Sequence, residues 1–333
     1  MKREKVCILG GSGFVGRHLA HHLTGRGTEV IIPTRRRERH KDLLVNPRIR
    51  LVECNVHDTR TLRELLQGAD AVVNLVGILN ESGNDGSGFR RVHVELPQKI
   101  VNACLAEGVT RLLHMSALNA YPREEHSLYL RTKGEGEDLV HAAAAQGLEV
   151  TSFRPSVIFG PGDSFFNRFA GLLRLTPWIF PLACPDAKMS PVCVGDVVAA
   201  FLRALDDDDT IGRHCDLCGP EVCTLQELVE YTARVIGVRR RILRLGNTGS
   251  WLQARLLEFV PGKPFSRDNF WSLQKEGVCP ENCLRRLGIE PTAIAAVVPL
   301  YLGNGSLRSR YQQLRALAHR DPELVGVLVG GRG

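Results

Sequence analysis

The sequence contains no long uninterrupted apolar run. Its longest apolar stretch, residues 169–184, is broken by Arg174, Thr176 and two prolines. It therefore falls short of the roughly 20 apolar residues that span a bilayer, and we expect no transmembrane helix. No signal-peptide stretch precedes the first strand-like segment either, because residues 1–5 lead directly into Val6–Leu9. These features predict a cytoplasmic, prokaryotic protein that is either free or peripheral at the inner face of the membrane.

Aromatic residues are also scarce, at 6% of the chain, and the basic residues are scattered. A nucleic-acid surface usually combines clustered basic residues with aromatic side chains that stack on bases, so we expect no nucleic-acid partner. Apolar residues at 44% and charged residues at 24% are ordinary for a folded protein and exclude a disordered chain. The net charge of +7 favours anionic ligands or surfaces without choosing among them.

The first half of the chain alternates short β-branched runs with helical patterns. The expected strands are residues 5–9, 29–33, 50–53, 71–77, 111–116 and 149–154. Helical stretches such as 14–24 and 61–66 separate them. This alternation is typical of an α/β fold with a doubly wound parallel sheet of the Rossmann type.

The pattern changes near Gly160, where segments punctuated by proline and glycine begin. Within the second half, Thr224 and Glu227 predict a capping box for a helix that runs toward Ile236. Asp196 is expected to cap a helix over 197–205, and residues 206–209 are interpreted as a solvated acidic loop. The expected division is a dinucleotide-binding domain over 1–160 with 190–208 packing back onto it, a smaller interleaved C-terminal substrate or partner region over 161–189 and 209–305, and an Arg-rich tail over 306–333.

A glycine-rich turn, Gly10-Gly-Ser-Gly-Phe-Val-Gly16, joins the first expected strand to the first expected helix. Its glycines permit a tight turn, close approach of a pyrophosphate to the backbone, and close packing of helix on strand. The helix N-terminus adds N–H donors for the anion. In this context a dinucleotide site is favoured over an ordinary flexible turn. The expected contacts are Gly10, Ser12, Gly13, Phe14, Val15 and Gly16.

The second expected strand ends without the acidic residue that usually binds the adenosine ribose of NAD. Arg35, Arg36 and Arg37 stand there instead. Guanidinium groups complement a 2′-phosphate through charge-assisted hydrogen bonds. Arg35 and Arg36 therefore predict a preference for NADP(H), with NAD(H) as the alternative cofactor, and Arg37 is better explained as part of a solvated loop.

Three residues further along the chain suggest acid–base chemistry. Ser116 closes the fifth expected strand, and Tyr129 and Lys133 follow on an expected helix. Residues four apart share a helical face, so the Lys133 ammonium is expected to lie near the Tyr129 phenol and lower its pKa. A surface helix is the alternative, but the preceding dinucleotide turn favours a functional site.

These motifs together resemble the short-chain dehydrogenase/reductase superfamily, in particular its extended and atypical, epimerase/dehydratase-like members. The sequence is most similar to the family of nucleotide-binding accessory subunits of respiratory complex I, subunit nine of its alpha subcomplex, and their bacterial relatives. The resemblance covers roughly residues 5–300. The segments that carry it are 73–79, 114–118, 129–135, 154–161, 165–170 and 191–196.

The resemblance implies roles for individual residues. Ser116, Tyr129 and Lys133 would be catalytic, with Tyr129 as the acid/base and Lys133 also holding the nicotinamide ribose. His93 stands where extended members often have asparagine, and we expect it to be a packing residue rather than a proton relay. Further cofactor contacts implied by the resemblance are Asn55, Val56, Leu75, Val76, Gly77, Pro155 and Ser156.

Two functions follow from the resemblance. One is an NADP(H)-dependent oxidoreductase that acts on a carbonyl, alcohol or quinone-type substrate. The other is a non-catalytic nucleotide-binding accessory or assembly factor of a respiratory or ubiquinone-related complex, associated with a membrane. The motifs alone do not choose between them, because tyrosine and lysine also serve nucleotide binding.

Cysteines and large apolar residues in the second half leave further alternatives open. The ten cysteines are expected to be reduced thiols, and a zinc site is disfavoured because the spacings fit finger patterns loosely. The apolar clusters 178–180 and 251–259 are expected to be core. They could instead line a pocket for a quinone, or meet a membrane surface with help from Arg255 and the arginines 239–241.

Overall fold

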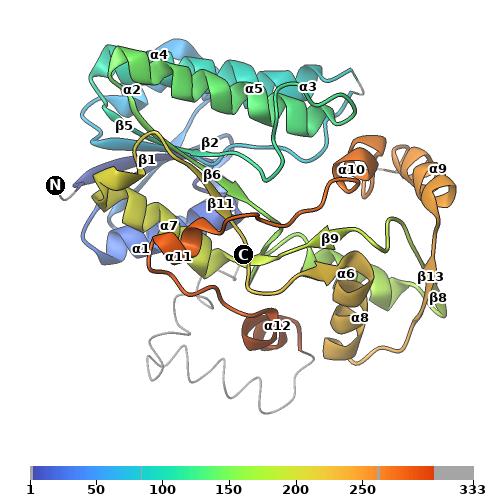
Figure 1. Ribbon diagram of the computed structural model, residues 1–333. Helices are drawn as coiled ribbons and strands as arrows, with labels where there is room; N and C mark the ends of the chain where they lie inside the picture. The colour runs from blue at the N-terminus through green and yellow to red at the C-terminus, as the bar shows by residue number, and fades with distance from the viewer. Residues whose placement is uncertain (1–2, 84, 261–262, 304–333) are drawn as a thin grey trace.

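A seven-stranded parallel sheet forms the centre of the protein (Figure 1). The computed structural model describes residues 3–83, 85–260 and 263–303. The strand order is β11-β6-β5-β4-β1-β2-β3, and every neighbouring pair is parallel. The strands are β1 (Lys5–Leu9), β2 (Glu29–Thr34), β3 (Ile49–Glu53), β4 (Ala71–Asn74), β5 (Arg111–Met115), β6 (Glu149–Pro155) and β11 (His214–Leu217). The predicted doubly wound Rossmann-type sheet is confirmed.

Helices cover both faces of this sheet. On one face lie α2 (Thr59–Leu66), α4 (Leu96–Glu107) and α5 (Leu128–Ala142), and on the other α1 (Phe14–Gly25), α7 (Val194–Asp206) and α11 (Cys283–Arg286) (Figure 1). In β1, Val6 and Ile8 pack into one core while Cys7 and Leu9 pack into the other. Since both faces are buried, the strands are continuous apolar runs rather than alternating ones.

The smaller region has its own core around Phe159, Phe166, Leu228 and Val298. Its helices are α6 (Phe166–Leu175), α8 (Leu225–Val235), α9 (Asn247–Leu257), α10 (Arg267–Ser272) and α12 (Ile294–Leu302). Its strands form two-stranded ribbons. These pair β7 (Ile158–Phe159) with β10 (Val192–Cys193), β9 (Lys188–Met189) with β12 (Cys223–Thr224), and β8 (Ile179–Leu182) with β13 (Arg241–Arg244). The predicted capping box between Thr224 and Glu227 is present at the start of α8.

Short helical segments complete the described chain. They are the 3-10 helices η1 (Arg37–Val45), η3 (Ala143–Gln146) and η4 (Asp208–Thr210), the α-helical turn α3 (Ser87–Arg90) and the π-helical turn η2 (Arg91–Glu95). The expected tail over 306–333 lies outside the described residues.

The chain is interleaved more deeply than the sequence predicts. Residues 214–217, expected in the smaller region, form β11 at the edge of the main sheet beside β6. Asp196 does not cap its helix, because α7 begins two residues earlier at Val194. Its carboxylate instead accepts hydrogen bonds from the backbone N–H and the hydroxyl of Thr292. It therefore ties the last described segment to the main sheet.

One cysteine pair contradicts the expectation of ten reduced thiols. Cys218, just after β11, and Cys279, between α10 and α11, form a disulfide with their Cα atoms 6.0 Å apart. These two residues are 61 positions apart in sequence, so no local spacing indicates the pairing. Cys215 and Cys283 lie in contact nearby as free thiols, and hydrogen bonding to Cys283 together with burial raises the pKa of Cys215.

The apolar clusters of the second half are divided between core and surface. Phe180 is buried, as predicted for a core residue, but Trp178 is 81% exposed and Phe259 is 84% exposed. Leu252 and Leu256 on α9 are exposed as well. The prediction that these clusters are core is therefore wrong for most of their members. Among the described residues, no helix combines the length and apolar character that a membrane crossing requires.

Candidate functional site

The site residues predicted from sequence gather along the carboxyl edge of the main sheet. Gly10 follows β1, Arg35 follows β2, Asn55 follows β3 and Leu75 follows β4. The strand order reverses at β1, which pairs with β4 on one side and β2 on the other. In open α/β sheets a ligand binds outside the carboxyl ends of the strands at such a switch point.

The glycine turn has the geometry that a pyrophosphate requires. Gly10 has φ +80°, and a Cβ there would lie 3.0 Å from the carbonyl carbon of Leu75. A Cβ on Gly16 would lie 2.5 Å from the Gly10 carbonyl oxygen, so this glycine lets α1 pack against the turn. Gly13 is exposed and directly precedes α1. Its bare backbone and the helix N-terminus therefore face solvent and fit a dinucleotide phosphate.

Arg35 and Arg36 extend from the end of β2 at this edge, and both are exposed. Neither forms an ion pair with a carboxylate among the residues that the structure describes. The backbone N–H of the next residue, Arg37, donates to the Glu53 carboxylate at 2.8 Å. The two guanidinium groups of Arg35 and Arg36 are therefore available to an added anion beside the glycine turn.

Three of the predicted cofactor contacts use their polar groups within the protein. The Asn55 side-chain oxygen accepts from the His57 backbone N–H, which makes a local turn after β3. The Ser156 hydroxyl donates to the Gly277 carbonyl at 2.8 Å, and the Val76 N–H donates to the Asn74 side chain. Val56 and Pro155 supply apolar surface near the ends of β3 and β6. All five residues lie at the expected edge. The bonded polar atoms are those of Asn55, Ser156 and Val76.

Tyr129 and Lys133 meet the end of β4 from helix α5. The Lys133 Nζ donates to the Met115 carbonyl at 2.9 Å, and a Cβ placed on Gly77 would lie only 3.1 Å from it. The Tyr129 ring packs edge-on against the ring of His93, with their centroids 5.5 Å apart. Lys133 is buried, whereas Gly77 is exposed, and the missing side chain at Gly77 leaves room near the Lys133 ammonium.

His93 is a packing residue, as predicted. It is buried, its Nε2 accepts from the Ile78 backbone N–H at 3.1 Å, and its Nδ1 contacts the Thr132 hydroxyl. Burial, followed by the nearby Lys133 charge, lowers the pKa of His93 to about 2. A neutral His93 therefore fixes the loop after β4 against α5.

The expected effect of Lys133 on Tyr129 is wrong. Burial raises the pKa of Tyr129 to about 12, and the Asp268 carboxylate adds to this rise. Burial lowers the pKa of Lys133 to about 8, although Glu137 opposes that shift. The phenol is consequently protonated at neutral pH, because burial and the Asp268 carboxylate both disfavour the phenolate.

Ser116 directly follows Met115, whose carbonyl accepts from Lys133, but its side chain bonds within the protein. Its hydroxyl is buried and donates to Glu137 at 2.7 Å, one helical turn beyond Lys133 on α5. The side chain is thus engaged beneath the helix. The hydroxyl is not presented to a substrate in this arrangement.

Glu137 is a residue that the sequence analysis did not identify. Its carboxylate accepts from Arg154 on β6, from the Ser116 hydroxyl and from His214 on β11, at 2.6 to 2.9 Å. Burial opposes its ionisation, but the partners His214, Arg154 and Ser116 prevail and hold the pKa of Glu137 at about 2. This buried anion connects α5 to three strands.

Glu137 also belongs to a cluster of three residues that are common metal ligands. Donor atoms of Glu137, His141 and His214 lie within 4.8 Å of one another. The His141 and His214 rings are stacked 3.9 Å apart at 24°, so their lone pairs run side by side and do not converge. Both Glu137 oxygens also accept from the Arg154 Nε. The cluster therefore fits a hydrogen-bonded network better than a cation site.

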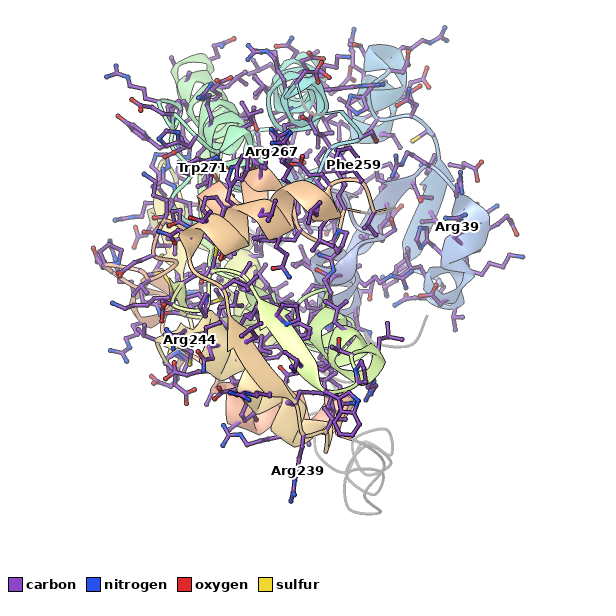
Figure 2. All side chains as sticks on the ribbon, turned by 90° about the vertical axis from the view of Figure 1, so that its right-hand side faces the viewer. Arg39, Arg239, Arg244, Phe259, Arg267 and Trp271 are labelled. Atoms are coloured by element: carbon purple, nitrogen blue, oxygen red, sulfur yellow. A yellow bond between two sulfur atoms is a disulfide. The ribbon has the colours of Figure 1, made fainter. Side chains whose placement is uncertain are left out.

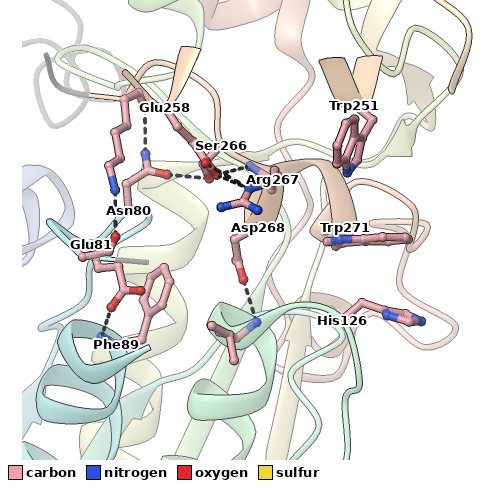
Figure 3. Close-up of a pocket in the computed structure, with 13 residues that line it drawn as sticks. Asn80, Glu81, Phe89, His126, Trp251, Glu258, Ser266, Arg267, Asp268 and Trp271 are labelled. Carbon is pink, nitrogen blue, oxygen red and sulfur yellow. Dashed lines mark hydrogen bonds and ion pairs between the residues drawn. The ribbon is translucent and has the colours of Figure 1, made fainter. Parts of the chain in front are cut away.

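A cavity of about 290 Å³ lies between the loop after β4, the start of α5, and α9 with α10 (Figure 3). Tyr129 is not one of its lining residues, but its ring contacts Phe89, which is. Phe89, Trp251 and Trp271 supply its aromatic walls, and Trp271 stacks on His126. Asp268 accepts from the backbone N–H groups of Leu128 and Tyr129 at the first turn of α5. No motif indicates Asp268, since it contacts Tyr129 from 139 residues away.

The Glu137 network predicts a specific dependence of stability on pH. The pKa of this carboxyl is lowered from 4.5 to about 2 in the folded state, so its contribution is complete above pH 4.5 and is lost as pH falls toward 2. That contribution is on the order of 3 kcal/mol. Glu137→Gln should be less stable at pH 7 and show a flatter fall in unfolding free energy between pH 5 and 2, measured by denaturant titration.

An exposed carboxylate provides the control. Glu64 pairs with Arg60 on the surface of α2, so Glu64→Gln should leave both the stability and its pH dependence close to those of the unmodified protein. Parallel pH curves for Glu137→Gln and the unmodified protein would contradict the assignment of Glu137 as a buried anion.

The chain is similar to known proteins along most of its length. It is 30% identical to the mouse protein "NADH dehydrogenase [ubiquinone] 1 alpha subcomplex subunit 9, mitochondrial", over 95% of this chain and 82% of that protein. It is also 30% identical to the Neurospora crassa NADH-ubiquinone oxidoreductase 40 kDa subunit, over 89% and 78%. A ceramide reductase of Caulobacter vibrioides is 29% identical over 74% and 75%. The resemblance inferred from the motifs is confirmed.

Solved structures share the fold. MoeE5 in complex with UDP-glucose and NAD has a TM-score of 0.69 at 19% identity, covering 93% of this chain and 99% of that one. The structure of gox2253 has a TM-score of 0.70 at 18% identity, with 89% and 96% covered. Residues 6–218 match the family described as "NAD dependent epimerase/dehydratase family". With the glycine turn at the switch point of a seven-stranded parallel sheet, the chain belongs to the NAD-dependent epimerase/dehydratase family.

Proposed function

We propose that this protein is an NADP(H)-dependent oxidoreductase that reduces a carbonyl or quinone-type substrate. The observation that carries the proposal is the meeting of Tyr129 and Lys133 with the open edge at Gly77, beside the glycine turn. The exposed Arg35 and Arg36 support NADP(H) over NAD(H) as the nucleotide. The tight turn that supports a dinucleotide here depends on Gly10 and Gly16, because a Cβ on Gly10 would meet the Leu75 backbone and a Cβ on Gly16 would meet the turn itself.

Different residues at the sheet edge would bind different parts of the nucleotide. The backbone of Gly10 to Gly13 and the start of α1 would hold the pyrophosphate, and Arg35 with Arg36 would hold a 2′-phosphate. Lys133 would bind the nicotinamide ribose by turning from the Met115 carbonyl toward the space beside Gly77. When bound, NADPH supplies the hydride for reduction of the substrate carbon.

Tyr129 suits the proton-donating role in this direction. With a pKa of about 12 its phenol carries a proton at neutral pH, so it can donate to an oxygen that gains negative charge. An alkoxide is a stronger base than a phenolate, which makes this transfer favourable. Oxidation of an alcohol would need the phenolate, which burial and the Asp268 carboxylate disfavour.

The cavity next to Phe89 supports a substrate with an apolar or aromatic part and a polar end, since Glu81, Glu258 and Arg267 also line it. Phe89, Trp251 and Trp271 offer apolar walls, and the Phe89 ring also contacts the Tyr129 ring, 6.1 Å between centroids. The name of the Caulobacter relative, ceramide reductase, describes a reductase of a lipid substrate. Both observations support a hydrophobic carbonyl compound or a quinone as the substrate class.

One observation favours a second function. Because the Ser116 hydroxyl is held by Glu137, the site has two of its three predicted catalytic groups at the open edge. A protein that binds NADP(H) without turnover, as an accessory or assembly factor of a respiratory or quinone-related complex, is consistent with that arrangement. The complex I subunits among the relatives support this alternative.

The nucleotide preference can be tested with one charge reversal. Each charge-assisted contact to a 2′-phosphate contributes about 1.5 to 3 kcal/mol, so Arg36→Glu should weaken NADPH binding by roughly tenfold or more and remove the preference over NADH. Isothermal titration calorimetry measures both affinities. Arg39→Glu is the matched control, since Arg39 is exposed on η1 three residues away. Equal affinities of the unmodified protein for the two nucleotides would rule out the preference.

Removal of one hydroxyl separates the two functions. Tyr129→Phe keeps the ring contacts with His93 and Phe89 but deletes the proton donor, so a reductase should lose turnover by about a hundredfold or more. NADPH affinity should change by less than about tenfold, because at most one hydrogen bond is lost. NADPH consumption with a panel of aldehydes and quinones provides the readout.

Lys133→Met completes this test. It should weaken NADPH binding whether or not the protein turns over, because Lys133 faces the space beside Gly77. Full activity of Tyr129→Phe would show that the proton comes from another group. Tight NADPH binding without consumption of any substrate in the panel would favour the accessory function.

A further inference from the structure

The smaller region exposes large apolar side chains on the face that Figure 2 views directly, where α9 crosses above the ribbon of β8 and β13. The large exposed apolar residues of these elements and of the segments next to them are Leu175, Trp178, Ile179, Leu243, Leu252, Leu256 and Phe259. We refer to these residues as the ribbon–α9 face. Trp178 and Phe259 expose four-fifths or more of their area, at 81% and 84%. Clustered exposed apolar residues of this size mark an interaction surface.

Backbone and side-chain contacts join the two parts of the ribbon–α9 face. In the ribbon, Ile179 pairs with Arg241, so these neighbours point to the same exposed side. The Gln253 side chain on α9 donates to the Pro181 carbonyl of β8 at 3.1 Å. Leu252 and Leu256 lie one helical turn apart on α9, which ends near Phe259. These contacts place α9 against the ribbon, so the exposed apolar residues of the two lie on neighbouring elements.

Arginine predominates among the charged residues around this face, which Asp186 and Glu258 border. Segments 172–185 and 239–257, which carry most of the face, contain six arginines and no lysine, aspartate or glutamate. Arg239 and Arg241 form no ion pair with a carboxylate in the described parts of the chain, whereas Arg244 pairs with Asp186. The Arg255 guanidinium lies 5.6 Å from the centre of the Trp251 ring. The surface thus combines apolar side chains with a positive potential.

From this combination we propose that the ribbon–α9 face docks on the surface of an anionic lipid bilayer. Tryptophan and phenylalanine insert at the boundary between headgroups and acyl chains, while arginines reach the lipid phosphates. A protein partner for an apolar face needs no such excess of arginine. The residues act as a peripheral anchor, because the described helices include none that could cross the membrane.

Docking in this way places the cavity next to the bilayer. Trp251 contributes to the cavity wall from α9, the helix whose Leu252 and Leu256 belong to the ribbon–α9 face. A lipid-soluble substrate could then reach the cavity without crossing water. This consequence rests on the proposed reductase function, but the docking itself does not.

Sedimentation with vesicles tests the proposal on the full-length protein. Vesicles of phosphatidylcholine with about 30% phosphatidylglycerol should bind it, and pure phosphatidylcholine vesicles should bind it far less. Binding should weaken as salt rises from about 0.1 M to about 0.5 M. Arg239→Gln combined with Arg241→Gln should lower the partition coefficient by about 25-fold, at roughly fivefold for each arginine.

Two further variants separate insertion from simple charge attraction. Trp178→Ala combined with Phe259→Ala should lower the partition coefficient by at least about tenfold. Thermal unfolding should be unchanged, since both side chains are exposed. The blue shift of tryptophan emission on binding should disappear in Trp178→Phe. Val45→Ala combined with Arg39→Gln is the matched control on the dinucleotide-binding half, where both residues are exposed, and it should bind like the unmodified protein.

Three results would overturn the proposal. One is absence of binding to the anionic vesicles. Another is equal binding of the ribbon–α9 variants and the control variant. The third is formation of a dimer in solution that the Trp178 and Phe259 changes abolish, because a second copy of the chain would then be the partner. If the unmodified protein binds the anionic vesicles but does not consume NADPH with any substrate, the proposed reductase function is wrong and the docking proposal stands.

Discussion

The buried carboxylate of Glu137 is the interaction on which the site depends. It joins α5 to β5, β6 and β11 through Ser116, Arg154 and His214. An anion buried this deeply is stable only because each of its oxygens accepts hydrogen bonds, two of which come from a guanidinium. Lys133 lies one turn before it on the same helix. The position of the lysine at the open edge therefore follows from how firmly Glu137 holds the helix.

The other end of α5 is fixed from the smaller region. Asp268 accepts from two N–H groups at the first helical turn, where the helix dipole also favours a negative charge. Asp268 lies on α10, so the position of Tyr129 depends on how the smaller region packs against the main sheet. A movement of α10 would change both the cavity and the pKa of Tyr129. Both regions therefore hold helix α5.

Local sequence patterns predict the parts of this protein that are determined locally. The alternation of strands and helices predicts the sheet, and Gly10, Gly13 and Gly16 predict the turn, because backbone conformation and close approach require glycine there. The spacing of Tyr129 and Lys133 likewise places both on α5. These predictions need only neighbouring residues and the geometry of a helix or a strand.

What the sequence could not predict depends on contacts between distant segments. Nothing near Ser116 shows that Glu137 would bind its hydroxyl, and nothing near Tyr129 shows that Asp268 would raise its pKa. The pairing of Cys218 with Cys279 and the place of β11 in the main sheet have the same origin. An apolar residue such as Trp178 is predicted to be core from its side-chain type alone. Side-chain type does not show whether other segments cover it, and Trp178 is exposed.

A crystal structure of the protein with NADP(H) tests the central claim most directly. The account predicts the pyrophosphate at Gly10 to Gly13, the 2′-phosphate beside Arg35 and Arg36, and the Lys133 Nζ moved from the Met115 carbonyl to the ribose. The nicotinamide should lie within reach of the Tyr129 hydroxyl. A nucleotide bound away from the β1 turn, or bound there with Lys133 still on Met115 and the nicotinamide turned away from Tyr129, would contradict the account.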